Sequence, residues 1–580
     1  MALPGGPAPL TVKEQKGWWR VREPHLWFCL LAVGLLSGPA RTCPAACQCF
    51  GETTIFCTGG AIEDVPPGIP PNATQLVFAE TSLQSLCSRA FGNSSALSTL
   101  RFLKSPLRSL AEAAFGGLPH LQELVISGSN LSALAKEHFS GLANLTRLAI
   151  KFSPLAALEG SLFNNTSGLR SLHLQGSQLQ SLPPDIFQPL QGLQSLHLTQ
   201  NLLAELPEET FEPLLLLQLL HLTDNRLSRL LPKTFLPLEK LQELLLDGNQ
   251  LTDLPRGIFS RLPHLRRLQL RYNALQHLRP TTFSSLSSLT TLALDNNQLS
   301  DLPDGLFEGT PNLTRLSVTH NHLQTIPERL FANLSSLSRL DLSHNLLCHL
   351  PTGVFQGLSA LTQLRLDHNS LSALPREVLA NLSVLEVLRL AHNNFTTLQR
   401  DAFANLTQLT VLDLANNHLA SLPAGIFDSS LLLNYVALEG NPWACDCRLA
   451  PLASWLREDR WRLKTGAFCS RPSYLERASL QEVREELLVC VPDPEAALCK
   501  ARVQDPSSSP WAQCLYLDPA GAARLTCSAD RCHELSLCLP PDEHLRPSQP
   551  LNFSTAWALD SPCGPKRVRI TVTVQEEESP

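Results

Sequence analysis

The side chains in this sequence with the clearest capacity for chemistry are histidines that recur every 24 residues. The first histidine file consists of His173, His197 and His221. The second histidine file consists of His320, His344, His368 and His392, each one residue before an asparagine. Imidazole nitrogens bind zinc and other transition metals, so neighbouring members of one file could face a shared ion if they stood on adjacent strands.

The spacing within each file limits such metal binding. Adjacent strands lie about 4.8 Å apart, so the first and third members of a file, about 10 Å apart, could not bind the same ion. Stacked imidazole rings also oppose each other's protonation. We therefore expect both files to form a solvated, weakly pH-sensitive surface, and we predict no metal site.

No arrangement typical of catalysis is evident in the sequence. It contains no nucleophile elbow, no phosphate-binding glycine loop and no H-E-x-x-H motif. His120 and Glu123 have the H-x-x-E spacing that zinc carboxypeptidases use. However, His120 falls in an expected connection and Glu123 on an expected strand, which favours a chance match. We predict a protein that is not an enzyme and that has neither catalytic residues nor a cofactor.

A repeated pattern positions both histidine files. The template L-x-x-L-x-L-x-x-N-x-L recurs every 24 residues without insertion or deletion. Its asparagines are Asn201, Asn225, Asn249, Asn273, Asn297, Asn321, Asn345, Asn369, Asn393, Asn417 and Asn441. Counting backward in the same register gives Ser177, Ser153, Ser129, Ser105 and Thr81.

This pattern is typical of leucine-rich repeats, in which each repeat is a strand plus a return segment that cannot bury its apolar face alone. We predict an α/β-type leucine-rich repeat solenoid, with one curved parallel sheet forming a horseshoe. Outward residues such as Arg267 and Gln269 would line its concave surface. Ten residues after each of the first fifteen register positions stands a phenylalanine, except at Leu379, which predicts a convex hydrophobic spine.

The register asparagine should point inward at the end of each strand, where its amide can satisfy backbone groups that the turn leaves unpaired. Serine and threonine would do this less completely. The first five repeats should therefore be held less tightly than the repeats that contain asparagine.

The ends of the repeat array indicate secretion. Residues 1–40 have the features of a signal peptide, with an apolar run over 26–36 behind basic residues and a cleavage site after Ala40. No later segment has about 18 uninterrupted apolar residues, so a secreted protein is expected. The net charge of −6 gives no reason to expect nucleic acid or an anionic membrane as a partner.

The cysteines outside the leader lie almost entirely beyond the repeats and indicate disulfide-bonded caps in an oxidising compartment. A zinc site formed by the closely spaced cysteines is disfavoured, since no histidine completes a usual set. We predict an N-terminal cap over 41–75, repeats over 76–440, a C-terminal cap over 441–491, a linker over 492–512 and a β-rich tail module over 513–580. Strict alternation over 567–574 predicts the last strand of that module.

Cys87 and Cys348 lie inside repeats, eleven periods apart. This separation is far too great for them to pair with each other. We therefore expect each to be a buried thiol.

Twelve N-x-S/T sequons predict heavy glycosylation. They are Asn72, Asn93, Asn130, Asn144, Asn164, Asn165, Asn312, Asn333, Asn381, Asn394, Asn405 and Asn552. None occurs between Thr166 and Pro311, so six consecutive repeats present a sheet without nearby glycans.

This bare stretch has outward residues of the kind that dominate protein–protein contacts. They define a candidate docking patch, which consists of His173, His197, His221, Leu245, Arg267, Gln269, Arg271 and Tyr272. We expect Arg267, Arg271 and Tyr272 to be its anchors.

The cysteine-rich flanks resemble those of extracellular leucine-rich repeat proteins. Spacing alone does not determine which cysteines pair. The resemblance implies four disulfides, Cys43–Cys49, Cys47–Cys57, Cys445–Cys469 and Cys447–Cys490.

The chain also resembles the large non-catalytic subunits of carboxypeptidase N. The motifs that carry this resemblance are Cys43-Pro44-Ala45-Ala46-Cys47, Gly440-Asn441-Pro442-Trp443 and, most specifically, Ser561-Pro562-Cys563-Gly564 in the tail. It implies a glycosylated plasma protein that binds, stabilises and regulates the catalytic subunit, in a tetramer of two heterodimers. That partner would be a zinc carboxypeptidase acting on peptides with C-terminal Arg or Lys. A free-standing extracellular recognition protein, of the pattern-binding or matrix type, is the alternative.

Overall fold

The computed structural model describes residues 43–490 except 45, 52, 93 and 458–465, and beyond residue 490 it describes the backbone of four short strands. The expected leader over 1–40 and linker over 492–512 lie outside the described residues. Within the described part of the chain, no helix is both long and apolar enough to cross a membrane.

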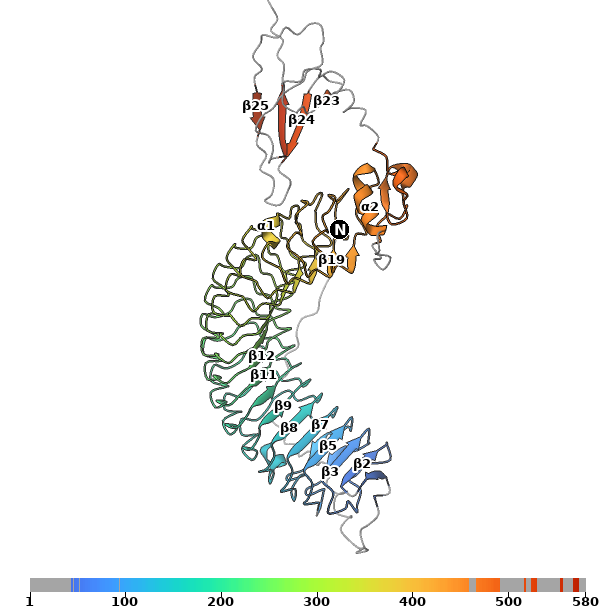
Figure 1. The fold of residues 1–580 in the computed structure, drawn as a ribbon. Helices are drawn as coiled ribbons and strands as arrows, with labels where there is room; N and C mark the ends of the chain where they lie inside the picture. Colours follow the sequence, from blue (N-terminus) through green and yellow to red (C-terminus); the bar gives the residue numbers. More distant parts are fainter. Residues whose placement is uncertain are drawn as a thin grey trace, which may run out of the picture.

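The repeats stack into one curved solenoid whose strands follow the inner edge of the arc (Figure 1). The main sheet has eighteen strands. Strands β1 and β2 form an antiparallel hairpin, and from β2 onward each strand of the sheet pairs in parallel with the strand of the next repeat. This architecture is the predicted leucine-rich repeat horseshoe.

The strands of the main sheet fall into two lengths. The longer ones are β1 (Cys47–Phe50), β2 (Thr54–Thr58), β3 (Gln75–Ala79), β5 (Thr99–Leu103), β7 (Glu123–Ser127) and β8 (Arg147–Lys151). The three-residue strands are β9 (Ser171–His173), β10 (Ser195–His197), β11 (Leu219–His221), β12 (Glu243–Leu245), β13 (Arg267–Gln269), β14 (Thr291–Ala293), β15 (Arg315–Ser317), β16 (Arg339–Asp341), β17 (Gln363–Arg365), β18 (Val387–Arg389), β19 (Val411–Asp413) and β20 (Tyr435–Ala437).

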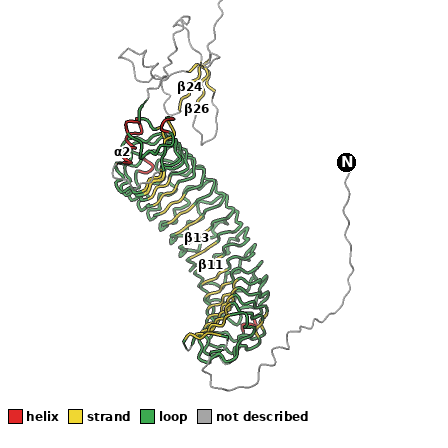
Figure 2. The backbone as a smooth tube through the Cα atoms, turned by 90° about the vertical axis from the view of Figure 1, so that its right-hand side faces the viewer, coloured by secondary structure: helices red, strands yellow, loops and turns green. Residues whose placement is uncertain are grey.

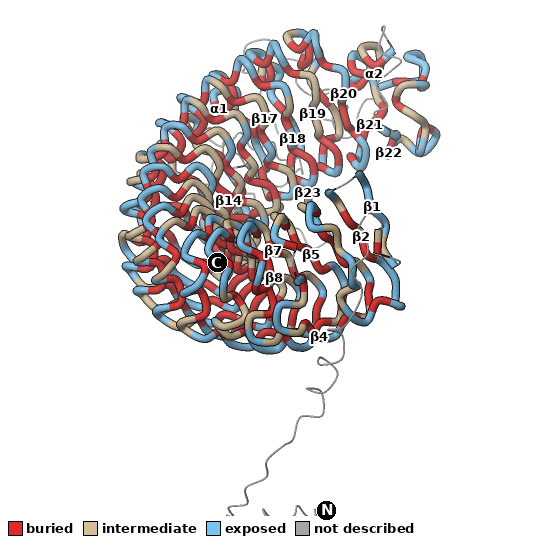
Figure 3. The backbone as a smooth tube through the Cα atoms, turned by 90° about the horizontal axis from the view of Figure 1, so that it is seen from below, coloured by how far each residue is buried: buried red, intermediate tan, exposed pale blue. Residues whose placement is uncertain are grey.

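The core runs as one continuous column inside the coil. In β13, Leu268 is buried while Arg267 points outward, because successive strand residues face opposite sides of the sheet. The same alternation of buried and exposed residues recurs around each coil (Figure 3). Each repeat therefore buries its leucines only against its neighbours, which makes stability depend on stacking.

The register asparagines tie neighbouring repeats together, as predicted. Asn249 is buried, and its Nδ2 donates to the carbonyl oxygens of Leu222 and Leu246 at 3.0 Å each. Its Oδ1 accepts from the backbone N–H of Leu227 at 3.1 Å. Since buried backbone groups are costly to leave unpaired, each asparagine stabilises both its own repeat and the one before it.

The hydroxyl residues at the same register position bond differently. Thr81 Oγ1 lies 2.8 Å from Ser105 Oγ, and Ser129 Oγ lies 2.7 Å from Ser153 Oγ, so these side chains pair mainly with each other. Ser177 Oγ is buried and has no hydrogen-bond partner among the described residues. A serine or threonine at this position hydrogen-bonds fewer backbone groups than an asparagine does. That the first five repeats are held less tightly therefore remains our prediction.

The convex side consists mainly of turns. Figure 2 faces the strands of the concave side, and loops and turns link these strands. A repeat of 24 residues leaves few residues for the return. Among the described residues of the array, helical structure is limited to single turns, η2 (Lys136–Phe139) and α1 (Arg376–Leu379). The short strands β4 (Ser85–Leu86) and β6 (Ser109–Leu110) pair there as well. From Phe187 to Phe355 the buried rings of the spine stack with centroids 6.1–6.4 Å apart. Leu379, the exception in this file, lies in α1.

Disulfides secure both caps, in the same four pairs that the resemblance implied. Cys43–Cys49 and Cys47–Cys57 hold the β1–β2 hairpin over the first repeat. Cys445–Cys469 and Cys447–Cys490 hold the C-terminal cap.

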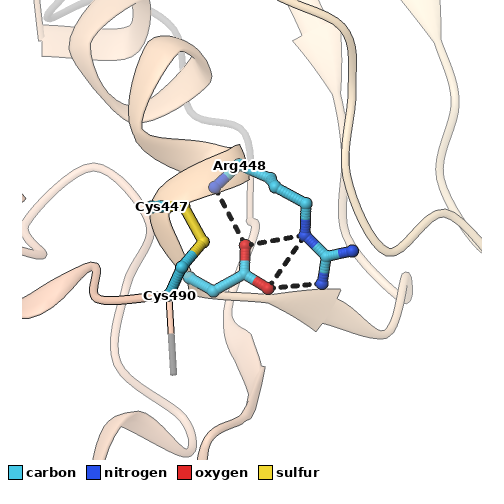
Figure 4. Close-up of a disulfide and its surroundings, with 4 residues drawn as sticks. Cys447, Arg448 and Cys490 are labelled. Carbon is cyan, nitrogen blue, oxygen red and sulfur yellow. Dashed lines mark hydrogen bonds and ion pairs between the residues drawn. A yellow bond between two sulfur atoms is a disulfide. The ribbon is translucent and has the colours of Figure 1, made fainter. Parts of the chain in front are cut away.

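The C-terminal cap closes the last apolar layer of the solenoid. It contains β21 (Trp443–Ala444), η3 (Cys447–Leu449), α2 (Ala450–Arg457), β22 (Cys469–Arg471), η4 (Ser473–Leu475) and η5 (Glu485–Leu487). Trp443 is fully buried, and its indole N–H donates to the carbonyl oxygen of Leu438 at 2.9 Å. Beside the Cys447–Cys490 bridge, Asp446 accepts from the backbone N–H of Arg448 at 2.9 Å and thereby caps η3 (Figure 4).

The expectation that Cys87 and Cys348 are buried thiols is wrong. Both sulfurs are in disulfide bonds, and Cys87 is only partly buried. The distance argument excluded only a bond between these two residues and left every other cysteine of the chain available.

Beyond the cap, four antiparallel strands form a small sheet in the order β23–β24–β26–β25. They are β23 (Tyr516–Leu517), β24 (Ala523–Ser528), β25 (Phe553–Ala556) and β26 (Arg567–Val572). The last strand thus begins at the predicted residue and ends two residues before the predicted 574. All four strands lie within residues 513–580, and the bounds of the tail module remain a prediction.

Candidate functional site

All residues of the docking patch lie on five consecutive repeats of the concave sheet. The three histidines end β9, β10 and β11, and Leu245 and Gln269 occupy the corresponding positions of β12 and β13. Arg267 begins β13, while Arg271 and Tyr272 follow it. The constant register therefore brings together side chains that are up to 99 residues apart in the sequence.

The histidines of the patch contact one another directly. The ring centroids of His173 and His197 are 4.0 Å apart with planes 7° from parallel, and those of His197 and His221 are 4.2 Å apart and nearly perpendicular. The hydroxyls of Ser171 and Ser195 lie 3.0 and 2.8 Å from the Nε2 atoms of His173 and His197. The first histidine file is a packed aromatic row.

These histidines should be uncharged at neutral pH. Burial, reinforced by the positive charges of Lys151 and Arg147, lowers the pKa of His173 to about 4. Burial and the neighbouring imidazoles lower the pKa of His197 to about 3. Burial also lowers the pKa of His221, although the carboxylate of Glu243 opposes the shift. The patch therefore presents a neutral aromatic row rather than a positive one.

The arginines of the patch are paired with acidic residues that the sequence analysis did not name. Arg267 Nη1 lies 3.8 Å from Glu243 Oε1, which is also 3.1 Å from His221 Nε2. Arg271 Nε lies 2.7 Å from Asp295 Oδ2, in an ion pair without the alignment of a hydrogen bond. Comparing charges at a spacing of 24 residues would have found both arginine pairs.

Tyr272 stands at the rim of the patch. It adopts a left-handed backbone conformation with φ of 53°, and the residue is 61% exposed. An exposed tyrosine beside an arginine held in an ion pair is well suited to protein contact, because both side chains offer large areas at low entropic cost.

The second histidine file lies at the register position of Tyr272, farther along the array. His320, His344, His368 and His392 all have φ between 52° and 54°. Each neighbouring pair of rings stacks with centroids 4.0 Å apart. These rings follow the strands instead of ending them, so the second file runs along the edge of the sheet.

The two residues of the H-x-x-E match lie in a turn and on a strand. Glu123 lies in β7, where its carboxylate is 3.0 Å from Arg101 Nη2 and 3.8 Å from Arg147 Nη1. His120 lies in the preceding exposed turn. The carboxylate is engaged by two cations on the sheet, which agrees with a chance match.

Ten of the twelve sequon asparagines are described, and all ten are exposed. Asn93 and Asn552 lie outside the described residues. The amides of Asn144, Asn312 and Asn405 each donate to a backbone carbonyl of the preceding repeat, in the connections that enter a strand. None of the ten lies within a strand of the main sheet.

A family model described as leucine rich repeat matches most of the array. The matched segments are residues 97–155, 143–203, 191–251, 239–299, 287–347, 311–371, 336–395, 360–419 and 383–442. Together they run without a break from 97 to 442, which is more than half of the chain.

Two curated relatives are named carboxypeptidase N subunit 2. The protein of Mus musculus is 40% identical over 162 residues, which are 25% of this chain and 29% of the relative. The protein of Homo sapiens is 40% identical over 161 residues, which are 26% of this chain and 29% of the relative. The matched segment thus spans less than a third of either relative.

Solved structures share the fold. The Drosophila Toll–Spatzle complex matches with a TM-score of 0.66 and 22% identity, covering 77% of this chain and 65% of that chain. A leucine-rich repeat protein of Leptospira interrogans matches with a TM-score of 0.55 and 30% identity, covering 66% of this chain and 88% of that chain.

Proposed function

The chain belongs to the leucine-rich repeat family, and we propose that within this family it is a secreted, non-catalytic subunit that binds, stabilises and regulates a zinc carboxypeptidase. The partner would be the catalytic subunit of carboxypeptidase N, which acts on peptides with C-terminal Arg or Lys, in a tetramer of two heterodimers. The observation that carries this proposal is the 40% identity to two proteins named carboxypeptidase N subunit 2.

The fold supports a binding role rather than catalysis. A stacked solenoid offers a long concave surface, which repeat proteins use to bind other macromolecules. The carboxylates of Glu243 and Asp295 are engaged by arginines of the docking patch, and the histidines of the patch pack against one another. This arrangement suits recognition of a protein surface.

We place the contact with the carboxypeptidase on the docking patch. Its neutral histidines and Leu245 can be buried without the cost of desolvating a charge. Arg267 and Arg271 are already oriented by their acidic partners, so docking would cost them little side-chain entropy. The absence of sequons across these repeats leaves the patch uncovered by glycans.

Secretion and glycosylation belong to the same proposal. The disulfides of both caps require an oxidising compartment, and the exposed sequons are accessible to glycosylation there. The expected leader over 1–40 would direct the chain to that compartment.

The alternative is a free-standing extracellular recognition protein. It is favoured by the limited extent of the similarity, since the matched segment covers 29% of the named relatives. Such a protein would share the fold, the caps and the glycans, and would differ only in having no carboxypeptidase partner.

Co-expression distinguishes the two functions. The full-length chain is produced in mammalian cells together with the catalytic subunit of carboxypeptidase N, and the secreted proteins are purified through an affinity tag on the enzyme. The proposal predicts that the chain co-purifies in a stoichiometric complex and lengthens the half-life of the enzyme at body temperature. An enzyme that elutes alone, with an unchanged half-life when the purified chain is added, leaves the free-standing recognition protein as the better account.

A further inference from the structure

The second histidine file contains three side chains with converging donor atoms. One ring nitrogen each of His344 and His368 and a carboxylate oxygen of Asp367 all lie within 4.8 Å of one another. The two repeats are joined at this point, because the backbone N–H of His344 donates to the carbonyl oxygen of Asp367 at 2.9 Å. In the part of the chain that the structure describes, no other group of three or more His, Cys, Asp or Glu residues has this arrangement.

One oxygen of the Asp367 carboxylate has no hydrogen-bond partner among the described residues. This oxygen, Oδ1, is buried, and no described donor contacts it. The contrast with Asp341 in the neighbouring repeat is clear, because Asp341 Oδ1 accepts from the backbone N–H of Ser343 at 3.1 Å and from its hydroxyl at 2.6 Å. A buried carboxylate oxygen without a donor is costly, and a cation is one way to satisfy it.

Among the histidines of the second file, only His368 follows an acidic residue. The residue before His320 is Thr319, the residue before His344 is Ser343, and the residue before His392 is Ala391. The second histidine file therefore has several pairs of stacked rings, but only one of its histidines directly follows a carboxylate, that of Asp367, which lies near the ring nitrogens of one pair. This distinguishes a defined three-ligand cluster from a row of equivalent surface histidines.

We propose that His344, Asp367 and His368 form a binding site for a divalent transition-metal ion of the Zn²⁺ or Cu²⁺ class. A site with two imidazole nitrogens and one carboxylate oxygen binds such ions in preference to Mg²⁺ or Ca²⁺, which prefer sites formed by oxygen atoms alone. Zinc–ligand distances of about 2.0–2.2 Å require the donors to approach one another, which partly exposed side chains can do by small rotations. The remaining coordination positions are open to water or to a ligand from a bound protein.

The spacing of the rings alone predicts no metal site. Adjacent rings could face one ion, but the first and third rings of a file are too far apart to share it. The missing third ligand is the residue immediately before His368, whose side chain turns toward the rings of both repeats.

The test uses untagged, secreted full-length protein that has been stripped with a chelator and titrated with Zn²⁺ in a calorimeter. Wild type should bind one equivalent. His344→Asn, His368→Asn and Asp367→Asn should each weaken binding by more than the roughly 10–100-fold that loss of an outer-shell contact costs. Asparagine suits both histidine positions, since Asn296 and Asn416 adopt the same left-handed conformation at this register position.

Matched controls come from the same file. His320→Asn and His392→Asn remove stacked rings at identical backbone positions, outside the cluster, and should leave the affinity within about twofold of wild type. The electron paramagnetic resonance spectrum of Cu²⁺ bound to wild type should show hyperfine coupling to two imidazole nitrogens. In His344→Asn the coupling should be to one imidazole nitrogen.

Three results would each overturn the proposal. They are the absence of Zn²⁺ binding, unchanged affinity in Asp367→Asn, and equal losses in the cluster and control variants, which would indicate diffuse binding along the whole file. If a variant is not secreted, wild type still provides a test. Zn²⁺ should then protect His344 and His368, but not His320, from acylation by diethyl pyrocarbonate, and equal modification with and without Zn²⁺ would contradict the site. None of these readouts depends on the carboxypeptidase.

Discussion

Arg271 and Asp295 occupy the same register position in neighbouring repeats and form an ion pair, with 2.7 Å between Nε and Oδ2. The side chain of Asp295 is 9% exposed, and its other oxygen accepts from the hydroxyl of Ser317 and from the backbone N–H of Thr319 at 3.0 Å. Asp295 thus orients an arginine of the docking patch and also joins two repeats.

This dual role makes Asp295 important for stability. Asp295→Asn removes the charge and leaves buried donors poorly paired, so we expect it to reduce the free energy of unfolding by about 1–3 kcal/mol, measured by urea titration. The matched control is Asp301→Asn, at an exposed carboxylate 3.2 Å from His277, which should change stability by less than about 0.5 kcal/mol. Equal effects of the two substitutions would argue against the structural role of Asp295.

The register asparagines should contribute more to stability than the hydroxyl residues at the same position. Asn249→Ala removes three amide-to-carbonyl hydrogen bonds and leaves the backbone N–H of Leu227 without its acceptor, so a loss of about 3 kcal/mol is expected. Ser129→Ala removes one hydroxyl pair and should cost about 1 kcal/mol. The measurement is urea unfolding followed by hydrogen exchange in the repeats on either side. A larger loss for Ser129→Ala would contradict the explanation of the asparagine file.

The first histidine file should make the protein less stable in acid. The folded-state pKa values of His173 and His197, about 4 and about 3, lie below the usual 6.5, so below about pH 6.5 the unfolded chain binds protons that the folded chain does not. This contribution to stability is therefore lost as the pH falls from 6.5 toward 4. Replacing both residues by glutamine should flatten the pH dependence of the thermal midpoint over that range. Parallel profiles of variant and wild type would show that these rings do not remain neutral in the fold.

The proposed anchors should account for a measurable part of the binding energy. Tyr272→Ala and Arg267→Ala should each weaken association with the carboxypeptidase by about 1–2 kcal/mol, in surface plasmon resonance with the purified proteins. Leu431→Ala is the control, because Leu431 is 78% exposed but lies outside the docking patch. Losses at the control position as large as those at the anchors would place the contact elsewhere.

The regular spacing of the repeats explains why so much of the fold could be predicted from sequence. A constant period of 24 residues assigns the leucines of the template to the core and each register asparagine to the strand end, so the horseshoe and its hydrogen-bonded ladder follow from Asn249 and its equivalents. The partners of Arg271 and Asp367 were missed for another reason. These pairings depend on how side chains orient toward the neighbouring repeat. The 24-residue period indicates such a pair only when the residues at one position are compared with those around the equivalent position of the next repeat. The disulfides of Cys87 and Cys348 depend on contacts that no repeat pattern encodes.

A glycan placed in the docking patch tests the account most directly. Gln269→Asn combined with Arg271→Thr creates a sequon on β13, and Arg271→Thr alone is the control for loss of the ion pair with Asp295. Both variants are secreted with the catalytic subunit of carboxypeptidase N, occupancy of the new site is verified by mass spectrometry, and the affinity of the complex is measured. We expect the glycosylated variant to lose association below detection, while the control stays within about 1–2 kcal/mol of wild type. A variant that carries the glycan and still binds the enzyme with the affinity of the control would contradict docking on the concave sheet.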